Sequence, residues 1–328
     1  MKVLVTGGAG YIGRIAVKQL VNSGHEVVVL DNLSTGSREA LVEGVPFYEG
    51  DIRDPFFLRE MFGQENFDIV MHFAAKLIAP ESLAFPLEYY SNNTIGMHNL
   101  LTVMKEYNVN KIVFSSTAAV YGLLDKAPIE ENDPTCPINP YGESKLASEK
   151  MIEWASNAYG LEYVIFRYFN VAGGCKQGFA PTYQTTLVPR VLCAARGLTN
   201  KLSIFGNDYD TPDGTGIRDF IHVEDLVAAH VIAAEKMMTN EVQNGVYNLG
   251  SGSGFSVMEV FEVAKKVTKI DIPYEICDRR PGDPVKSVAS SKKAQEKLGW
   301  TRQYESLESI IEDAWWNIHQ SKAEENIS

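Results

Sequence analysis

The stretch Thr6-Gly7-Gly8-Ala9-Gly10-Tyr11-Ile12-Gly13 separates a short β-branched run, Val3–Thr6, from a helix-like segment near Ile12–Ser23. Its first, third and fourth glycines have the spacing G-x-x-G-x-x-G. This spacing permits a tight turn after a strand, a close approach of the backbone to a pyrophosphate, and close packing of the following helix. The pyrophosphate would lie on the unpaired N–H groups at the helix N-terminus. The stretch therefore predicts a strand, a phosphate-binding loop and a helix in succession.

An aspartate ends the next apolar run. Asp31 closes the segment Glu26–Asp31 and lies 18 residues after Gly13. A carboxylate at this place can accept hydrogen bonds from both hydroxyls of an adenosine ribose, and it would repel a 2′-phosphate. The order of strand, glycine loop, helix, strand and aspartate therefore predicts a dinucleotide site that favours NAD over NADP.

Strand-like and helix-like pieces alternate through the first half of the chain. The clearest are Ile69–Ala74, Pro86–Tyr107, Lys111–Ser116, Tyr141–Tyr159 and Tyr163–Phe169. Such alternation is typical of right-handed βαβ units, with a buried parallel sheet and helices on both of its faces. We therefore predict an α/β fold, with a Rossmann-type, doubly wound NAD-binding domain over residues 1–175. A smaller C-terminal lobe over residues 176–328 would mainly bind the substrate, with some segments free to return to the first domain.

The composition excludes several classes of partner. The chain has 328 residues, enough for two linked lobes, and its net charge is -12. An acidic surface repels phosphate backbones and anionic lipid, so we expect no nucleic-acid or membrane partner. No pair C-x-x-C and no zinc spacing occurs among the four cysteines, so we expect no metal; they are Cys136, Cys175, Cys193 and Cys277. Free thiols and an opening run without a signal peptide predict a cytoplasmic protein.

A candidate catalytic pair lies at the start of the helical segment 141–159. Tyr141-Gly142-Glu143-Ser144-Lys145 reads Y-x-x-x-K, and residues four apart share one face of a helix. A neighbouring ammonium stabilises a phenolate and lowers the tyrosine pKa from its usual value near 10. The pair could therefore supply a general base at neutral pH. Taken alone, this common pattern would more often be a surface pair.

Hydroxyl groups collect at the end of a predicted strand in Phe114-Ser115-Ser116-Thr117, which Ala118-Ala119 follows. In doubly wound folds ligands bind at the carboxyl edge of the sheet, where these hydroxyls would lie. A helix cap would also explain any one of them. Their position between the glycine loop and the tyrosine–lysine pair favours a role in the site.

The glycine loop, the hydroxyl run and the Y-x-x-x-K pair together resemble the extended short-chain dehydrogenase/reductases, and the resemblance covers essentially the whole chain. It implies that Tyr141 is the general base, that Lys145 holds the nicotinamide ribose, and that Thr117 hydrogen-bonds the reacting sugar hydroxyl. It also implies that the residues of the glycine loop contact NAD, with Gly7, Gly10, Tyr11, Ile12 and Gly13 among them.

Further segments are similar to the UDP-galactose 4-epimerase group of this family. They are PLEYY at 86–90, RYFN at 167–170, FGNDY at 205–209, DGTGIRDFIHV at 213–223 and RRPGD at 279–283. The resemblance implies further NAD contacts from Asp31, Asn32, Asp51, Ile52, Phe73, Ala74, Ala75, Asn92, Ser115, Tyr141, Lys145 and Tyr168.

The same resemblance implies a binding site for a UDP-sugar. Its contacts would be Thr117, Asn170, Thr186, Leu187, Phe205, Arg218, Arg280, Asp283 and Ser287. Arg218 and Arg280 would bind the diphosphate, because guanidinium forks match phosphate oxygens. Asp283 would take the uridine ribose, and Phe205 would line the uracil pocket.

The activity implied by the resemblance is a redox-neutral interconversion of UDP-galactose and UDP-glucose through a 4-keto sugar, with tightly bound NAD. Another NAD-dependent nucleotide-sugar epimerase or oxidoreductase of the family is the alternative. The related 4,6-dehydratases place Asp-Glu just after the hydroxyl run, where this chain has Ala118 and Ala119, whose methyl groups cannot move protons. A non-catalytic NAD(P) sensor would be expected to lose Tyr141 or Lys145.

The resemblance also implies which sugars the site accepts and how the chains assemble. A bulky tyrosine at the position of Ser287 closes the pocket to N-acetylated sugars, so this serine predicts additional turnover of UDP-GlcNAc and UDP-GalNAc. The helices over 86–107 and 141–159 often pair between subunits in this family, which predicts a homodimer. The segments 76–82 and 174–187 depart from the commonest pattern, and Arg14 stands where serine is usual.

Overall fold

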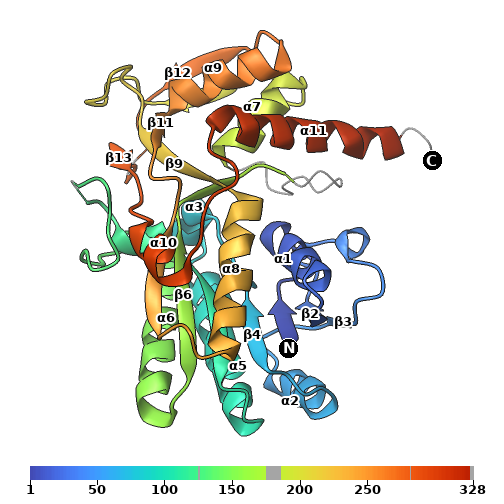
Figure 1. Ribbon diagram of the computed structural model, residues 1–328. Helices are drawn as coiled ribbons and strands as arrows, with labels where there is room; N and C mark the ends of the chain where they lie inside the picture. Colours follow the sequence, from blue (N-terminus) through green and yellow to red (C-terminus); the bar gives the residue numbers. More distant parts are fainter. Residues whose placement is uncertain (125, 175–185, 281, 326–328) are drawn as a thin grey trace.

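The computed structural model describes residues 1–124, 126–174, 186–280 and 282–325, with side chains as far as residue 317. Its larger part is a seven-stranded sheet with the order β10-β6-β5-β4-β1-β2-β3 (Figure 1). These strands are β1 (Lys2–Thr6), β2 (Glu26–Asp31), β3 (Phe47–Glu49), β4 (Ile69–His72), β5 (Lys111–Thr117), β6 (Glu162–Tyr168) and β10 (Gly245–Leu249). Every pairing is parallel, so the carboxyl ends of the strands meet at one edge.

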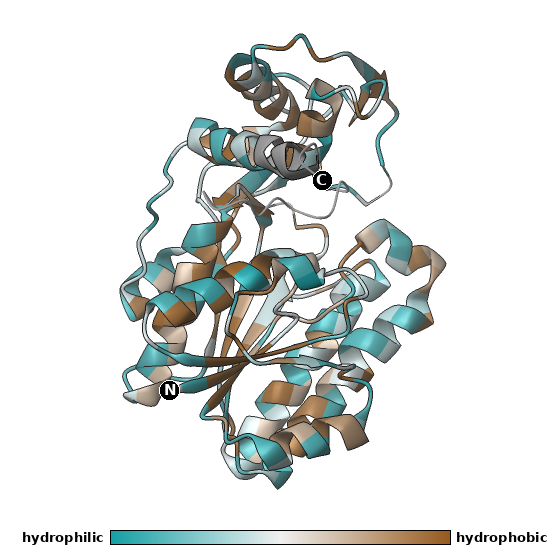
Figure 2. Ribbon diagram, turned by 90° about the vertical axis from the view of Figure 1, so that its right-hand side faces the viewer, coloured by the Kyte–Doolittle hydropathy of each residue, from teal (hydrophilic) through white to brown (hydrophobic). Residues whose placement is uncertain are grey.

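The alternation of side chains along the strands decides which helices cover each face. In β1, Val3 and Val5 pack with α1 (Tyr11–Asn22) and α8 (Val223–Met238), whereas Leu4 packs on the opposite face. The helices of that second face are α2 (Pro55–Gln64), α5 (Gly96–Glu106) and α6 (Pro140–Tyr159). Figure 2 shows hydrophobic strands at the centre and more hydrophilic residues on the helices around them. The predicted doubly wound α/β fold is confirmed.

The C-terminal part of the chain builds a smaller lobe around its own core. Its strands are β7 (Asn170–Ala172), β8 (Leu202–Phe205), β9 (Ile217–His222), β11 (Gly254–Ser256), β12 (Tyr274–Cys277) and β13 (Lys286–Ser287). Its helices are α7 (Leu187–Ala195), α9 (Val257–Thr268) and α11 (Leu307–Glu325). The later half also contributes to the large sheet, where β10 pairs with β6 and α10 (Lys292–Leu298) contacts β10. A domain boundary at residue 175 stays a prediction.

The single helix expected over 86–107 is divided in the structure. It consists of α4 (Pro86–Tyr89), the π-helical turn η2 (Tyr90–Ile95) and α5, and α3 (Ala79–Ala84) precedes it. A π-turn shifts the following side chains relative to an α-helix, and such turns occur often at functional sites. Hydrophobic spacing alone does not reveal such a turn, because the apolar pattern resumes after it. The remaining short turns are η1 (Arg38–Ala40) and η3 (Ala118–Tyr121).

A buried ion pair joins α6 to β6 beneath the carboxyl edge. Arg167 donates from Nε and Nη2 to the Glu149 carboxylate at 3.1 and 2.6 Å, and both side chains are more than nine-tenths buried. Ser116 also donates a hydrogen bond to Glu149, which ties the end of β5 to the pair. Water cannot solvate a charge in the protein interior. Loss of one partner would therefore leave an unpaired buried charge and lower the free energy of unfolding.

Arg167→Met is expected to lower the free energy of unfolding by about 3–5 kcal/mol, because Glu149 would stay buried without its partner. The double variant Glu149→Met/Arg167→Met removes both charges and should regain most of that loss. Urea unfolding followed by circular dichroism measures the free energy of both variants. Equal losses in the single and the double variant would contradict the electrostatic explanation and point to packing instead.

Candidate active site

The glycine loop leaves no room for side chains at two of its positions. Gly7 has a φ of +74°, and a Cβ there would lie 2.6 Å from the Ala74 amide nitrogen. A Cβ on Gly13 would lie 2.1 Å from the Gly7 carbonyl oxygen. The start of α1 therefore lies directly against the end of β1, beside the segment that follows β4. Such a backbone-lined cradle at a helix N-terminus fits the pyrophosphate of NAD.

Asp31 lies at the end of β2 and is held under this loop. Its two carboxylate oxygens accept hydrogen bonds from the backbone N–H groups of Ala9, at 3.0 Å, and Leu33, at 2.8 Å. Burial raises the pKa of Asp31, and these two hydrogen bonds oppose the shift. A carboxylate has about four acceptor positions, so two are left for ribose hydroxyls. The position fits the predicted adenosine contact.

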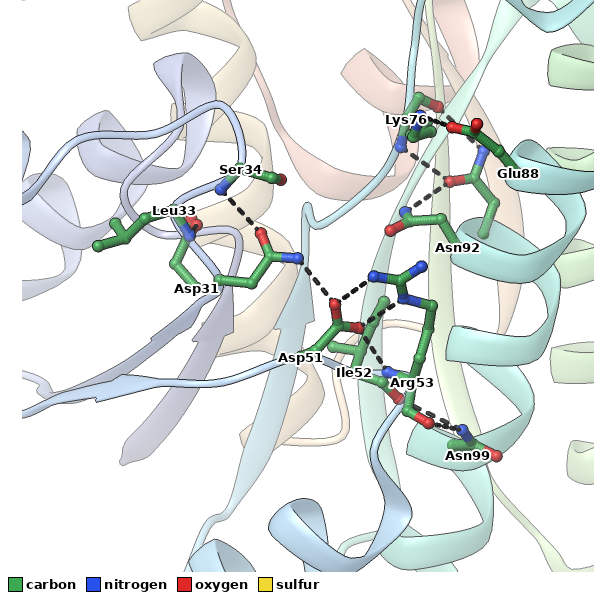
Figure 3. A network of polar contacts seen from close by, with 12 residues as sticks. Asp31, Leu33, Ser34, Asp51, Ile52, Arg53, Lys76, Glu88, Asn92 and Asn99 are labelled. Atoms are coloured by element: carbon green, nitrogen blue, oxygen red, sulfur yellow. Dashed lines mark hydrogen bonds and ion pairs between the residues drawn. The ribbon is translucent and has the colours of Figure 1, made fainter. Parts of the chain in front are cut away.

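Asn32 and Asp51 form a network next to Asp31 (Figure 3). Asn32 Nδ2 donates to Asp51 at 2.9 Å, and Arg53 donates from Nε and Nη2 to the same carboxylate at 2.9 and 2.6 Å. The hydrogen bonds from Arg53 lower the pKa of Asp51 to about 2. The structure thus brings together two predicted adenosine-side residues. Arg53 was not predicted, although a cation two residues after an aspartate is a signal that could have been used.

Asn92 lies in the π-helical turn, where its neighbour Asn93 connects three segments of the site. Asn93 Oδ1 accepts from the Lys76 backbone N–H at 2.9 Å and from Asn92 Nδ2 at 3.0 Å. Asn93 Nδ2 donates to Ser144 Oγ at 2.9 Å. The segment after β4, the π-turn and the first turn of α6 are therefore held together. The sequence analysis assigned a role to Asn92 and missed Asn93, because only the π-turn brings both amides to one place.

Two local features fix how α6 approaches the end of β5. Asn139 caps the helix, and its side chain accepts from the Gly142 backbone N–H at 2.9 Å. A Cβ on Gly142 would lie 2.7 Å from the Ala119 carbonyl oxygen, so only glycine permits this approach. The first turn of α6, which carries Tyr141, is therefore packed directly on the hydroxyl-bearing strand end.

The tyrosine and the lysine meet this strand end through hydrogen bonds. Lys145 Nζ donates to the Ser115 carbonyl at 2.7 Å. Burial lowers the pKa of Lys145 to about 7, and the Glu149 carboxylate opposes this shift. Burial raises the pKa of Tyr141, and its hydrogen bond with the Thr117 side chain opposes that shift. The partly buried Tyr141 and the buried Thr117 and Lys145 side chains thus lie at the same strand end.

Tyr168 and His230 lie beside this group at the end of β6. Tyr168 pairs in register with Thr117, and its hydroxyl is 2.5 Å from His230 Nε2. Burial lowers the pKa of His230 to about 3, so its imidazole is neutral at physiological pH. Farther along the chain, Asn170 Nδ2 donates to the Asp219 carbonyl at 3.0 Å. His230 is therefore a buried residue whose ring is held by Tyr168 and by the Leu226 carbonyl.

A cluster of arginines surrounds Phe205 in the smaller lobe. The Arg280 guanidinium carbon lies 3.7 Å from the centre of the Phe205 ring, and that of Arg190 lies 5.8 Å from it. Burial lowers the pKa of Arg280, and the positive charge of Arg190 adds to this shift. The predicted contacts Phe205 and Arg280 are therefore adjacent. Arg190 was missed, because its place on α7 beside β8 follows only from the tertiary structure.

The other predicted substrate contacts lie along β9 and its neighbours. Ser287 of β13 pairs with Arg218 of β9, and Arg218 Nη2 is 3.9 Å from Asp283 Oδ2. Thr186 is the exposed residue before α7, and Leu187 is its first residue. Most of the diverged segment 174–187 falls on residues 175–185, outside the described part. The individual binding roles of these residues stay predictions.

Two kinds of feature are absent from the part of the chain that the structure describes. No cluster of three or more His, Cys, Asp or Glu side chains there could hold a metal ion. Within the same ranges, no helix has the length and the apolar character that crossing a bilayer requires.

A family model and a curated relative match most of this chain. The model of the NAD dependent epimerase/dehydratase family matches residues 3–250. The UDP-glucose 4-epimerase of Halalkalibacterium halodurans is 52% identical over 325 residues, which cover 98% of this chain and 96% of that protein.

Solved structures of UDP-glucose 4-epimerases also match this chain. A crystal structure of a UDP-glucose 4-epimerase matches with a TM-score of 0.94 and 52% identity, covering 98% of both chains. The Bifidobacterium longum UDP-glucose 4-epimerase, in complex with NAD+ and UDP, matches with a TM-score of 0.90 and 38% identity over 98% of this chain and 99% of that one. The Campylobacter jejuni UDP-Glc/GlcNAc 4-epimerase matches with a TM-score of 0.86 and 42% identity over 97% and 99%.

These matches confirm the predicted family, its α/β fold and its use of NAD. The relative and the solved structures match over nearly the whole length of both chains, so the similarity does not depend on the glycine loop alone. The chain belongs to the NAD dependent epimerase/dehydratase family, and within it to the UDP-glucose 4-epimerases.

Proposed function

We propose that this chain interconverts UDP-galactose and UDP-glucose by inverting C4 of the hexose. The observation that carries the proposal is that Tyr141, Thr117 and Lys145 lie together at the same sheet edge as the glycine loop. The glycine loop and Asp31 would hold NAD+, which would supply the reversible hydride acceptance that inversion at C4 requires. The overall reaction is redox-neutral, so the cofactor is not consumed.

Tyr141 moves the proton in both half-reactions. Its phenolate accepts the proton of the sugar 4-hydroxyl as the 4-keto sugar forms, and its phenol gives the proton back when the hydroxyl is restored. The Lys145 ammonium stabilises the phenolate form, and the Thr117 hydroxyl hydrogen-bonds the tyrosine and would orient the sugar hydroxyl. These residues keep the proton within the site. Inversion then requires only that the 4-keto sugar rotate and present its opposite face.

Arg218 and Arg280 would hold the diphosphate while the sugar turns. Both guanidinium groups lie in the smaller lobe, and the burial that lowers their pKa values leaves them poorly compensated until an anion binds. A fixed nucleotide and a mobile hexose together explain how one base can serve both faces of the ring.

Dehydration of the sugar, the reaction of the related 4,6-dehydratases, finds no support in this site. Ala118 and Ala119 begin the turn η3 directly after Thr117, where elimination of water would require an acid and a base. Their methyl groups cannot transfer protons. A sensor that only binds NAD is disfavoured because the tyrosine, the lysine and the threonine are all retained.

Purified protein mixed with UDP-galactose, without added cofactor, is expected to form UDP-glucose in an NMR time course. Tyr141→Phe should lower kcat by about 10²–10⁴-fold, because the general base is lost, while UDP still binds. Thermal unfolding of the variant controls for misfolding. If the wild-type protein forms no UDP-glucose even with added NAD, the proposed reaction is wrong and another reaction of the family must be tested.

We further propose that N-acetylated UDP-sugars are substrates. Ser287 supports this, because its small side chain next to Arg218 leaves space where a tyrosine would not, and the Campylobacter jejuni enzyme with 42% identity is named for both sugars.

Wild-type protein is therefore expected to turn over UDP-GlcNAc, and Ser287→Tyr should abolish this turnover while UDP-galactose is still converted. The reason is the loss of space for the acetamido group. Lys286→Tyr is the matched control, because successive residues of a strand point to opposite faces. Rates for both sugars, measured by NMR, decide the question: equal effects of Ser287→Tyr on the two sugars would contradict it.

We also propose a cytoplasmic homodimer. The cysteines Cys136, Cys193 and Cys277 are free thiols, as in a reducing compartment, whereas Cys175 lies outside the described residues. For the dimer, α4 and η2 pack against α6, and their outward side chains include Leu87, 79% exposed, and Trp154, 72% exposed. Large exposed apolar groups on adjacent helices favour burial against a second copy.

Light scattering after size exclusion is expected to give twice the 36.4 kDa mass of one chain. Leu87→Asp/Trp154→Asp should shift the protein toward the monomer, because two charges would be buried at the interface. Phe56→Asp is the matched control, since Phe56 on α2 is also 79% exposed but lies on another helix. A wild-type monomer at micromolar concentration would refute the dimer.

A further inference from the structure

Tyr209 has a buried hydroxyl group for which no hydrogen-bond partner exists among the described residues. The whole residue is only 5% exposed. Buried hydroxyl groups in proteins almost always have a partner, either in the protein or in a bound molecule. Tyr209 belongs to the segment FGNDY, for which the family resemblance implied a role of Phe205 only. Its unpaired hydroxyl indicates a partner outside the described residues.

The ring of Tyr209 is fixed by its surroundings. Its backbone N–H donates to the Gly214 carbonyl at 2.9 Å. A Cβ on Gly206 would lie 2.5 Å from the ring, and the Arg279 guanidinium carbon lies 4.1 Å from the ring centre. Arg279 is itself held by Asp208, to which its Nε donates at 2.6 Å. The hydroxyl cannot swing away to find a partner without disturbing this packing.

Tyr209 lies beside the predicted nucleotide site, because Arg279, whose guanidinium group lies over its ring, directly precedes Arg280 in the chain. Burial raises the pKa of Tyr209, the Asp283 carboxylate adds to the shift, and the Arg218 guanidinium opposes it. Arg218 has unused donors as well: within the described residues it makes one hydrogen bond, from Nη1 to the Ile217 carbonyl at 2.9 Å, and it lies 3.9 Å from Asp283. Gly216 has no side chain to cover this guanidinium group.

A buried hydroxyl without a partner, near a guanidinium group with unused donors, favours a ligand that has several acceptor atoms and a negative charge. A phosphate oxygen meets both requirements, because it accepts more than one hydrogen bond and compensates the guanidinium charge. We propose that the Tyr209 hydroxyl donates a hydrogen bond to the diphosphate of the bound UDP-sugar, beside Arg218. This inference rests on the proposed function and adds a substrate-binding residue to it.

Tyr209→Phe removes only the hydroxyl and tests the inference directly. By calorimetry, the Kd for UDP should rise roughly tenfold, since a hydrogen bond to a charged group is lost. The KM for UDP-galactose should rise with little change in kcat, because the contact is present throughout the reaction. Binding of uridine, followed by ligand line broadening in NMR, should not change. The thermal midpoint of the ligand-free variant should not fall, because its hydroxyl has no partner to lose.

Tyr304→Phe is the matched control. The Tyr304 hydroxyl donates to Glu224 at 2.6 Å, so its loss should lower the thermal midpoint and leave the Kd for UDP unchanged. A Kd of Tyr209→Phe within twofold of the wild-type value, or an equal loss of uridine binding, would overturn the inference while the proposed function stands. Failure of the wild-type protein to bind UDP would overturn both.

Discussion

The close approach of the Gly7 backbone to Ala74 is the constraint on which the site depends. It places the end of β1 against the segment after β4, so that α1 begins where the two strands end. A side chain at Gly7 would clash with the Ala74 backbone and one at Gly13 with the Gly7 backbone, so either would separate these elements. Because the sheet is entirely parallel, the same edge also receives the ends of β5 and β6, which carry Thr117 and Tyr168.

Burial shifts the pKa values of Tyr141 and Lys145 in opposite directions. Burial disfavours charge, so it raises the pKa of Tyr141 and lowers that of Lys145. In the proposed reaction, a phenolate at Tyr141 and an ammonium at Lys145 would each make the other's charged form less costly. Glu149 supports the cation from one helical turn away while its own charge is held by Arg167. The buried ion pair thus serves the site as well as the fold.

Short sequence motifs predicted the helices and strands that neighbouring residues form. The glycine spacing, the apolar runs and Y-x-x-x-K are all short-range signals, and they correctly predicted β1, α1, α6 and the parallel sheet. The contacts that were missed join segments far apart in the chain. Asn93 reaches Ser144 only because of a π-turn, and Arg190 reaches Phe205 only because α7 packs beside β8. No spacing in a single sequence encodes such distances.

The chain as a whole is negatively charged, whereas arginines lie at the predicted substrate contacts of the smaller lobe. A net charge of -12 repels an anionic substrate, whereas Arg190, Arg218 and Arg280 gather around Phe205 and Asp283. Arg190 and Arg280 both lie beside the Phe205 ring, and their positive charges repel each other. A diphosphate bound between them would relieve this repulsion. In the proposed reaction, a sugar held mainly through its nucleotide would be free to turn between the two faces that epimerisation requires.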